Sequence, residues 1–412
     1  MRSLLVAIIV LLAFFQNWLL SISPVFGYID EAISLFCLCY YLVSKKNDWG
    51  RERHFVVPFI IVFFAGFLFN YAYGIQSSHM ALIEDSLSIF KFVFTYLGIK
   101  QYLCSRGINA VKIIKYVMFF VRIYLLILLA FALVNIVIPI GMDAGLRYGF
   151  RMFAFVYGTP GHLINQMTYA LIFIETFGIV CKKKIWFWEL AAVVVMMCTL
   201  KTRAFVLITF FYSMRFFVLG NVKVKLRYVL PVLAFLLYLI GYSQFEHYFI
   251  EDDAAPRAMF VNAAVKIVGD TFPWGTGYGT FGSSAAAKYY SPLYVACGFD
   301  NRWGMTQENP FFLNDNYFPM IFVQFGFAFA LIFLFGLYRY CKCVVKENTN
   351  KFCRFIAIFY VFDILQSSLQ SSYLAHFSVV TLTIVFLLCC YPNKKNGLLK
   401  YECEYDKEKL YI

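Results

Sequence analysis

Charged residues are scarce in this chain. Asp, Glu, Lys and Arg make up only 14% of its 412 residues, whereas apolar residues make up 62%. Soluble domains usually contain about 25% charged residues. A composition this poor in charge argues against a soluble enzyme and predicts an integral membrane protein.

Several common functional motifs are also missing. The sequence has no Walker A motif, no dinucleotide-binding glycine pattern and no HExxH motif. ATP-driven transport and zinc proteolysis therefore lose their usual sequence support. The twelve cysteines follow no disulfide framework, and the spacing of Cys341, Cys343 and Cys353 fits no common zinc site. We expect neither a metal nor a cofactor.

Long apolar stretches dominate what is present. A segment of about 20 apolar residues spans a bilayer, and the chain contains twelve such stretches. They cover residues 3–22, 26–43, 55–74, 86–103, 116–139, 161–180, 185–200, 204–219, 228–245, 317–336, 355–372 and 374–391. We therefore expect an all-α, polytopic membrane protein with about 12 transmembrane helices.

The basic residues predict an orientation in the membrane. The net charge of +13 collects in alternate loops, as at Lys182 to Lys184 and at Lys342, Lys346 and Lys351. Cytoplasmic loops carry an excess of Lys and Arg, so we expect both termini in the cytoplasm. A basic surface for nucleic acid would not alternate with the helices, so no nucleic-acid partner is expected.

One polar segment interrupts the apolar pattern. Residues 246–315 are long, turn-rich and aromatic. Loops longer than about 12–15 residues are usually functional or disordered, and the aromatic residues argue against disorder. We expect an extracytoplasmic loop that forms one wall of a site. The chain then divides into residues 1–139 (helices 1–5), 140–245 (helices 6–9 with arginine-bearing outer loops), 246–315 (the loop) and 316–412 (helices 10–12 and a cytoplasmic tail).

Three arginines lie on the predicted outer side, where cations are disfavoured. Arg151, Arg203 and Arg257 each stand where an apolar helix begins or ends. An interfacial arginine can extend its charge to water, but three suggest a shared anionic ligand. Because the guanidinium donates two parallel hydrogen bonds, we predict that they bind phosphate or diphosphate.

Other candidates lie near these arginines. Asp315 precedes the tenth stretch, where its carboxylate serves either as a general base or as a helix cap. His162 begins the sixth stretch, where it either contacts an anionic substrate or caps the turn. The glycine run from Gly275 to Gly279 permits close backbone approach to a ligand, or forms a plain turn.

Acidic residues within the apolar stretches need partners. Glu175 and Glu189 lie close to Lys182 to Lys184, and we expect them to pair there. Asp363 lies deeper, with Lys91 and Arg122 as candidate partners. Apart from these residues, we expect few buried charges.

These pieces, in this order, resemble the O-antigen polymerase and ligase family. The resemblance covers residues 140–340, and the earlier stretches are generic. It rests on Arg151 with Gly158-Thr159-Pro160, on Thr199 to Arg203, on Arg257 with Phe272 to Gly277, and on Asp315-Asn316-Tyr317 with Phe325-Gly326.

The resemblance implies a metal-independent glycosyltransferase of the bacterial cytoplasmic (inner) membrane, with no cofactor. Its substrate would be an oligosaccharide carried by polyprenyl diphosphate at the outer face. Polymerases join such repeat units, alongside a flippase and a chain-length regulator, whereas ligases pass the glycan to lipid A core. Ligases commonly carry a histidine where this chain has Asp315, which favours a polymerase.

The resemblance also implies roles for the candidates. Arg203 and Arg257 would stabilise the charge that grows on the departing diphosphate, and Asp315 would accept the proton of the attacking hydroxyl. The expected substrate-binding residues are Arg151, His162, Asn316, Tyr317, Trp274 and Gly277. The rings of Trp274, Tyr278 and Tyr289 would stack on sugars.

Two alternatives stay open. One is an O-antigen ligase, and the other is a lipid-linked oligosaccharide flippase or transporter. A flippase is expected to show internal repeats and charges lining the membrane interior. The sequence shows no repeat and few charges in its apolar stretches, so we prefer the polymerase.

Overall fold

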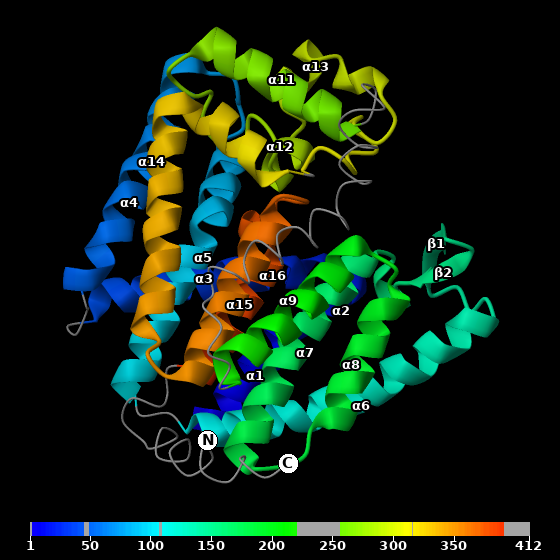
Figure 1. Ribbon diagram of the computed structural model, residues 1–412. Helices are drawn as coiled ribbons and strands as arrows, with labels where there is room; N and C mark the ends of the chain where they lie inside the picture. Colours follow the sequence, from blue (N-terminus) through cyan, green and yellow to red (C-terminus); the bar gives the residue numbers. More distant parts are fainter. Residues whose placement is uncertain (1, 45–48, 107–108, 221–255, 315, 391–412) are drawn as a thin grey trace.

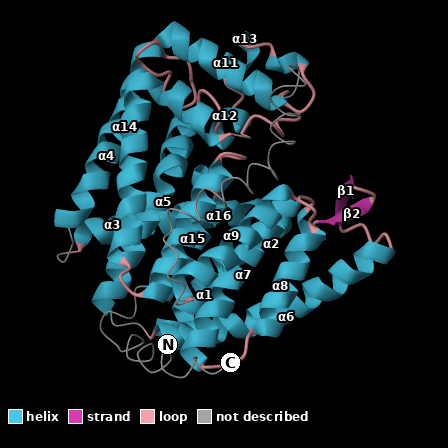
Figure 2. Ribbon diagram, viewed as in Figure 1, coloured by secondary structure: helices cyan, strands magenta, loops and turns pink. Residues whose placement is uncertain are grey.

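The computed structural model describes residues 2–44, 49–106, 109–220, 256–314 and 316–390. Helices form most of this part of the chain (Figure 1, Figure 2). The α-helices are α1 (Arg2–Phe14), α2 (Gln16–Ile22), α3 (Ile29–Val43), α4 (Trp49–Tyr73), α5 (His79–Arg106), α6 (Ala110–Val137), α7 (Pro160–Cys181), α8 (Trp186–Cys198), α9 (Thr202–Leu219), α11 (Pro256–Thr271), α12 (Ser284–Lys288), α13 (Pro292–Ala296), α14 (Tyr317–Glu347), α15 (Lys351–Ser368) and α16 (Phe377–Cys390).

Shorter elements join these helices. The 3-10 turns are η1 (Pro24–Tyr28), η2 (Phe155–Tyr157), η3 (Phe299–Asn301) and η4 (Tyr373–Ala375). Two strands, β1 (Asp143–Arg147) and β2 (Phe150–Phe153), form an antiparallel hairpin after α6.

The helices have the composition of a membrane protein. Six of those described are long and apolar enough to cross a bilayer, or up to seven if α1 and α2, bent by 69°, form one span. Each predicted stretch coincides with a helix, except 228–245, which lies outside the described residues. The all-α membrane fold is thus confirmed, while the number of twelve spans stays a prediction.

The described part of the long polar segment has structure of its own. Helices α11, α12 and α13 lie together at the top of Figure 1, beside the start of α14. Their small core includes Phe260, Phe281, Tyr294 and Leu313 with Val323 of α14. This apolar core, rather than turns alone, holds residues 256–314 over the end of the helix bundle.

Helix α14 is broken where the glycine run meets it. Gly326 has φ 69° and ψ 174°, which interrupts the helical hydrogen bonds. The run supplies the missing donors, because Thr276 N donates to Val323 O at 3.0 Å and Gly277 N donates to Gln324 O at 2.9 Å. Since unpaired buried carbonyls are costly, this segment is part of the helix packing and more than a surface turn.

Asp85 of α5 fixes the same segment from the other side. Its Oδ2 accepts hydrogen bonds from Gly279 N at 2.6 Å and from Gln324 Nε2 at 2.8 Å. Asn70 of α4 also bonds the backbone of Tyr278 through both ends of its amide. The glycine run is therefore clamped between α4, α5 and α14.

Buried charges are more numerous than expected. Lys91 pairs with Asp30 at 2.5 Å, and Lys100 pairs with Glu52 at 3.0 Å and with Glu347 at 2.8 Å. The expectation of few buried charges is therefore wrong, because helices far apart in sequence bring opposite charges together. This removes one argument against a transporter.

Glycine is required where the run crosses α14. A Cβ atom built on Gly275 would lie 2.2 Å from Gln324 O, which is a backbone atom that cannot move aside cheaply. We expect Gly275→Ala to lower the free energy of unfolding by about 3 kcal/mol or to prevent folding, since overpacking typically costs about 1–3 kcal/mol. Thermal unfolding of the purified protein in detergent measures this.

Gly269 in α11 is the matched control. No atom lies within 4 Å of a Cβ at that position, so Gly269→Ala should leave stability unchanged or raise it by about 0.5–1 kcal/mol. Equal thermal midpoints for the two variants would contradict this account of the packing.

Candidate functional site

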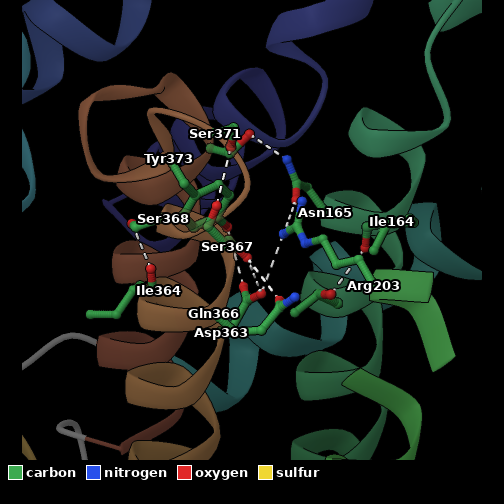
Figure 3. A network of polar contacts seen from close by, with 12 residues as sticks. Ile164, Asn165, Arg203, Asp363, Ile364, Gln366, Ser367, Ser368, Ser371 and Tyr373 are labelled. Carbon is green, nitrogen blue, oxygen red and sulfur yellow. Dashed lines mark hydrogen bonds and ion pairs between the residues drawn. The ribbon is translucent and has the colours of Figure 1, made fainter. Parts of the chain in front are cut away.

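A network of polar side chains joins the beginning of α9 to the end of α15. Arg203, the second residue of α9, directs Nη2 to Asp363 Oδ1 at 3.3 Å and to Asn165 Oδ1 of α7 at 2.6 Å (Figure 3). Asp363 also accepts hydrogen bonds from Ser367 Oγ at 2.9 Å and from Tyr373 OH at 3.2 Å. We call Asn165, Arg203, Asp363, Ser367 and Tyr373 the Arg203 cluster.

The cluster is almost sealed from the surroundings. The side chain of Arg203 is 10% exposed and that of Asp363 is 0% exposed. The guanidinium also lies over the ring of Tyr373, 5.1 Å from its centroid. A buried ion pair is tolerated only when hydrogen bonds satisfy its remaining atoms, and on Asp363 both carboxylate oxygens are satisfied.

Arg203 keeps donors that the described residues do not use. Both of its hydrogen bonds come from Nη2, while Nε is buried without a partner among the described residues. No hydrogen bond from Nη1 reaches any described residue either. Asp363 thus orients the guanidinium without using all of its donors.

The prediction that Asp363 pairs with Lys91 or Arg122 was wrong. Asp363 pairs with Arg203, whereas Lys91 pairs with Asp30 and Arg122 lies over the rings of Phe177 and Trp188. Asp363 also stands close to the end of α15 rather than deep within it. Lys91 and Arg122 were expected because they lie within apolar stretches, but the sequence does not show that α9 and α15 are adjacent in the fold.

Glu175 and Glu189 correct a second expectation. Both pair with Arg215 of α9, at 2.7 Å and 2.8 Å, instead of with Lys182 to Lys184. The lysines follow α7 directly, but the acids face α9.

Arg257 approaches the same connection as Arg203. It is the second residue of α11, and its Nη2 donates to Gln370 O at 3.4 Å. Gln370 lies between Asp363 and Tyr373, in the link from α15 to η4. The fold therefore brings two of the three predicted arginines, Arg203 and Arg257, to one short segment.

Arg151 lies elsewhere. It belongs to β2, and its Nη1 donates to Asn135 O at 3.2 Å near the end of α6. Carbonyls at a helix C-terminus lack intrahelical donors, so this contact accounts for Arg151 structurally. A neighbour in the hairpin, Arg147, donates to Leu200 O at 2.9 Å and so ties the hairpin to the start of α9.

His162 stands beside the Arg203 cluster. Its ring stacks on those of His376 and Phe377, with centroids 5.5 Å and 5.8 Å away. The residue preceding α7 is Thr159, and no side chain caps this helix. His162 therefore takes part in an aromatic group and does not cap the turn.

The residues around the start of α14 are mostly buried. Asp315 lies outside the described residues. Asn316 precedes the first turn of α14 without capping it, and its Oδ1 is buried without a partner among the described residues. Tyr317 is 0% exposed and packs against Phe318 and Phe333, so it lines no open surface.

The residue before the glycine run has an exposed aromatic ring. Trp274 is 48% exposed, where it contacts Phe69 and Phe329. Tyr278 is fully buried and donates to Phe63 O at 2.9 Å, so the expectation that it stacks on sugars is wrong. Gly277 serves the packing against α14 described above.

Several cluster residues had not been identified from the sequence. Asn165, Ser367 and Tyr373 are of this kind, as is His376 beside the cluster. A signal was available, because residues 366–373, at the end of the stretch 355–372, are serines, glutamines and a tyrosine with one leucine among them. A polar run of this kind at the end that carries the arginines indicates partners for them.

The cluster is built on an arginine and a carboxylate, with no sign of a metal site in the part of the chain that the structure describes. Among the described residues, no group of three or more His, Cys, Asp or Glu side chains is placed to hold a metal ion. Comparison of the chain with known protein families, curated proteins and solved structures finds no match. The interpretation therefore depends on the arginines, their orientation and their place at the helix ends.

Removing Asp363 should destabilise the protein strongly. In Asp363→Ala the charge of Arg203 stays buried without its ionic partner, and breaking such pairs costs about 3–5 kcal/mol. Thermal or denaturant unfolding of the purified variant checks the value.

The ion pair of Lys288 with Glu84 is the matched comparison. Its length is 2.8 Å, but Lys288 is 49% exposed. The hydrogen bond that Lys288 donates to Glu84 raises the pKa of Lys288, yet exposed pairs contribute only about 0–1 kcal/mol. A loss in Lys288→Ala as large as that in Asp363→Ala would contradict the assigned role of burial.

Proposed function

We propose that this chain is a membrane glycosyltransferase that joins polyprenyl-diphosphate-linked oligosaccharide repeat units into a surface polysaccharide. The observation that carries the proposal is Arg203, which Asp363 and Asn165 orient through one nitrogen while Nη1 makes no hydrogen bond to the described residues. Arg257 reaches the same segment. Two guanidinium groups that reach the link from α15 to η4 favour an anionic ligand there.

The reaction follows from the chemistry of the leaving group. A hydroxyl oxygen of one lipid-linked glycan attacks the anomeric carbon of another, and the bond from that carbon to the diphosphate breaks. The electron pair leaves with the polyprenyl diphosphate, and Asp315 accepts the hydroxyl proton. Because the bond is already activated, no nucleotide is consumed.

The arginines act where charge develops. Negative charge on the diphosphate increases as the glycosidic bond breaks, and donors that are already oriented stabilise the transition state without rearranging. Asp363, Asn165 and Tyr373 hold Arg203 in place for this purpose. A mostly buried site strengthens the interaction, because fewer water molecules screen it.

The competing functions predict different products. A ligase would transfer finished glycan to lipid A core, and a flippase would move repeat units across the membrane without joining them. The buried ion pairs of α3, α4 and α5 leave the flippase open, so the tests must separate elongation from transport.

Arg257→Ala should abolish long chains in a host that makes the cognate glycan. Loss of one charge-stabilising donor costs about 10²–10³ in the rate of elongation. Single repeat units should still be made and exported, because the substitution affects elongation alone. Arg257→Lys keeps the charge without the planar fork and should be intermediate. Gel electrophoresis of the glycan gives the distribution of chain lengths.

Arg302→Ala is the control, since Arg302 lies on the same segment and is exposed. It should leave chain length unchanged. Accumulation of repeat units on the cytoplasmic side in Arg257→Ala would instead support a flippase.

Asp315→Asn separates the two roles of that residue. Asn caps a helix as well as Asp does but cannot accept a proton at neutral pH. We expect normal protein levels and elongation lowered by about 10²–10⁴, which is the usual contribution of acid–base catalysis. Full elongation by this variant would remove Asp315 from the chemistry.

A further inference from the structure

A second histidine lies beside the Arg203 cluster and has no role so far. His376 precedes α16, next to His162 at the start of α7. Its ring is half-buried and packs on Phe377, with centroids 4.0 Å apart. Two histidines and two arginines therefore gather at this end of the helices.

A chain of hydrogen bonds connects Arg203 to His376. Arg203 Nη2 donates to Asn165 Oδ1 at 2.6 Å, and Asn165 Nδ2 lies 2.9 Å from Ser378 Oγ. Ser378 Oγ lies 2.9 Å from His376 Nδ1, to which Ser378 N also donates at 3.3 Å.

The direction of each bond in this chain is determined. Arginine can only donate, so the carbonyl oxygen of Asn165 must face it and the amide nitrogen must face Ser378. Ser378 Oγ accepts that bond, and because Ser378 N donates to Nδ1 of His376, that nitrogen is an acceptor and the Ser378 hydroxyl donates to it.

These hydrogen bonds select one tautomer of His376. The backbone N–H of Ser378 can only donate, and both bonds from Ser378 end at Nδ1. Nδ1 therefore carries no proton, and the ring is neutral with its hydrogen on Nε2. The Nε2–H group donates no hydrogen bond to any described residue.

We propose that His376 is a substrate-binding residue that donates its Nε2 hydrogen to a phosphate oxygen of the diphosphate bound by Arg203. The identity of this ligand rests on the proposed function. The tautomer rests on the hydrogen-bond geometry alone.

This assignment excludes His376 as the general base. A neutral ring whose Nδ1 is occupied by two donors has no lone pair to offer at Nε2. The proton of the attacking hydroxyl must therefore go elsewhere, in agreement with Asp315 as its acceptor. Asn165 and Ser378 become positioning residues, since they act through His376.

Nitrogen NMR of the full-length protein with labelled histidine tests the tautomer directly. The chain has only five histidines, and the signal lost in His376→Gln identifies the residue. We expect a protonated Nε2 and an unprotonated Nδ1. Addition of inorganic diphosphate should shift the Nε2 signal of His376. A proton on Nδ1, or no shift at saturating diphosphate, would overturn the proposal.

Two substitutions test the donor in the cell. Gln places an amide N–H near the position of Nε2, so His376→Gln should retain elongation to within about tenfold. His376→Ala removes the donor and should lower elongation by about 10²-fold. Thermal unfolding shows whether each variant is folded. Equal loss in the two folded variants would reject the donor role.

Failure of this inference differs from failure of the proposed function. If Arg257→Ala stops elongation while His376→Ala elongates normally, only the role of His376 is wrong. If neither variant changes the glycan, the polymerase itself is wrong, whatever diphosphate does to the spectrum.

Discussion

The ion pair between Arg203 and Asp363 is the interaction on which the candidate site depends. Its two charges come from α9 and α15, and almost no water reaches either of them. Removing charges from water is costly unless hydrogen bonds compensate, and here Asn165, Ser367 and Tyr373 supply them. One pair thus links α7, α9, α15 and η4, and it also fixes the direction of the guanidinium.

The glycine run solves a related problem at the break in α14. Gly326 interrupts the helix, and the backbone of Thr276 and Gly277 replaces the lost donors. Asp85 then holds the run against α5. These contacts secure the part of the chain that leads to α12 and α13. Helix α11, whose second residue is Arg257, packs in the same small core. The position of Arg257 therefore depends on backbone hydrogen bonds far from its own side chain.

The sequence was sufficient for the helical membrane fold, because long apolar stretches need few assumptions. It also singled out Arg203 and Arg257, since both lie on the predicted outer side, where cations require a reason. The pairing of Asp363 could not be predicted, because sequence alone does not show that α9 faces α15. Tyr278 was misread for a similar reason, since an aromatic ring in a polar segment can be buried once that segment packs on helices. The role proposed for His376 could be inferred only from the directions of four hydrogen bonds, and these are known from the structure and not from the sequence.

Reconstitution of the purified chain in a bilayer with polyprenyl-diphosphate-linked repeat units tests the central claim most directly. Our account predicts longer lipid-linked glycans and the release of one polyprenyl diphosphate for each new glycosidic bond. Movement of repeat units across the bilayer, with no new bond and no released polyprenyl diphosphate, would contradict it.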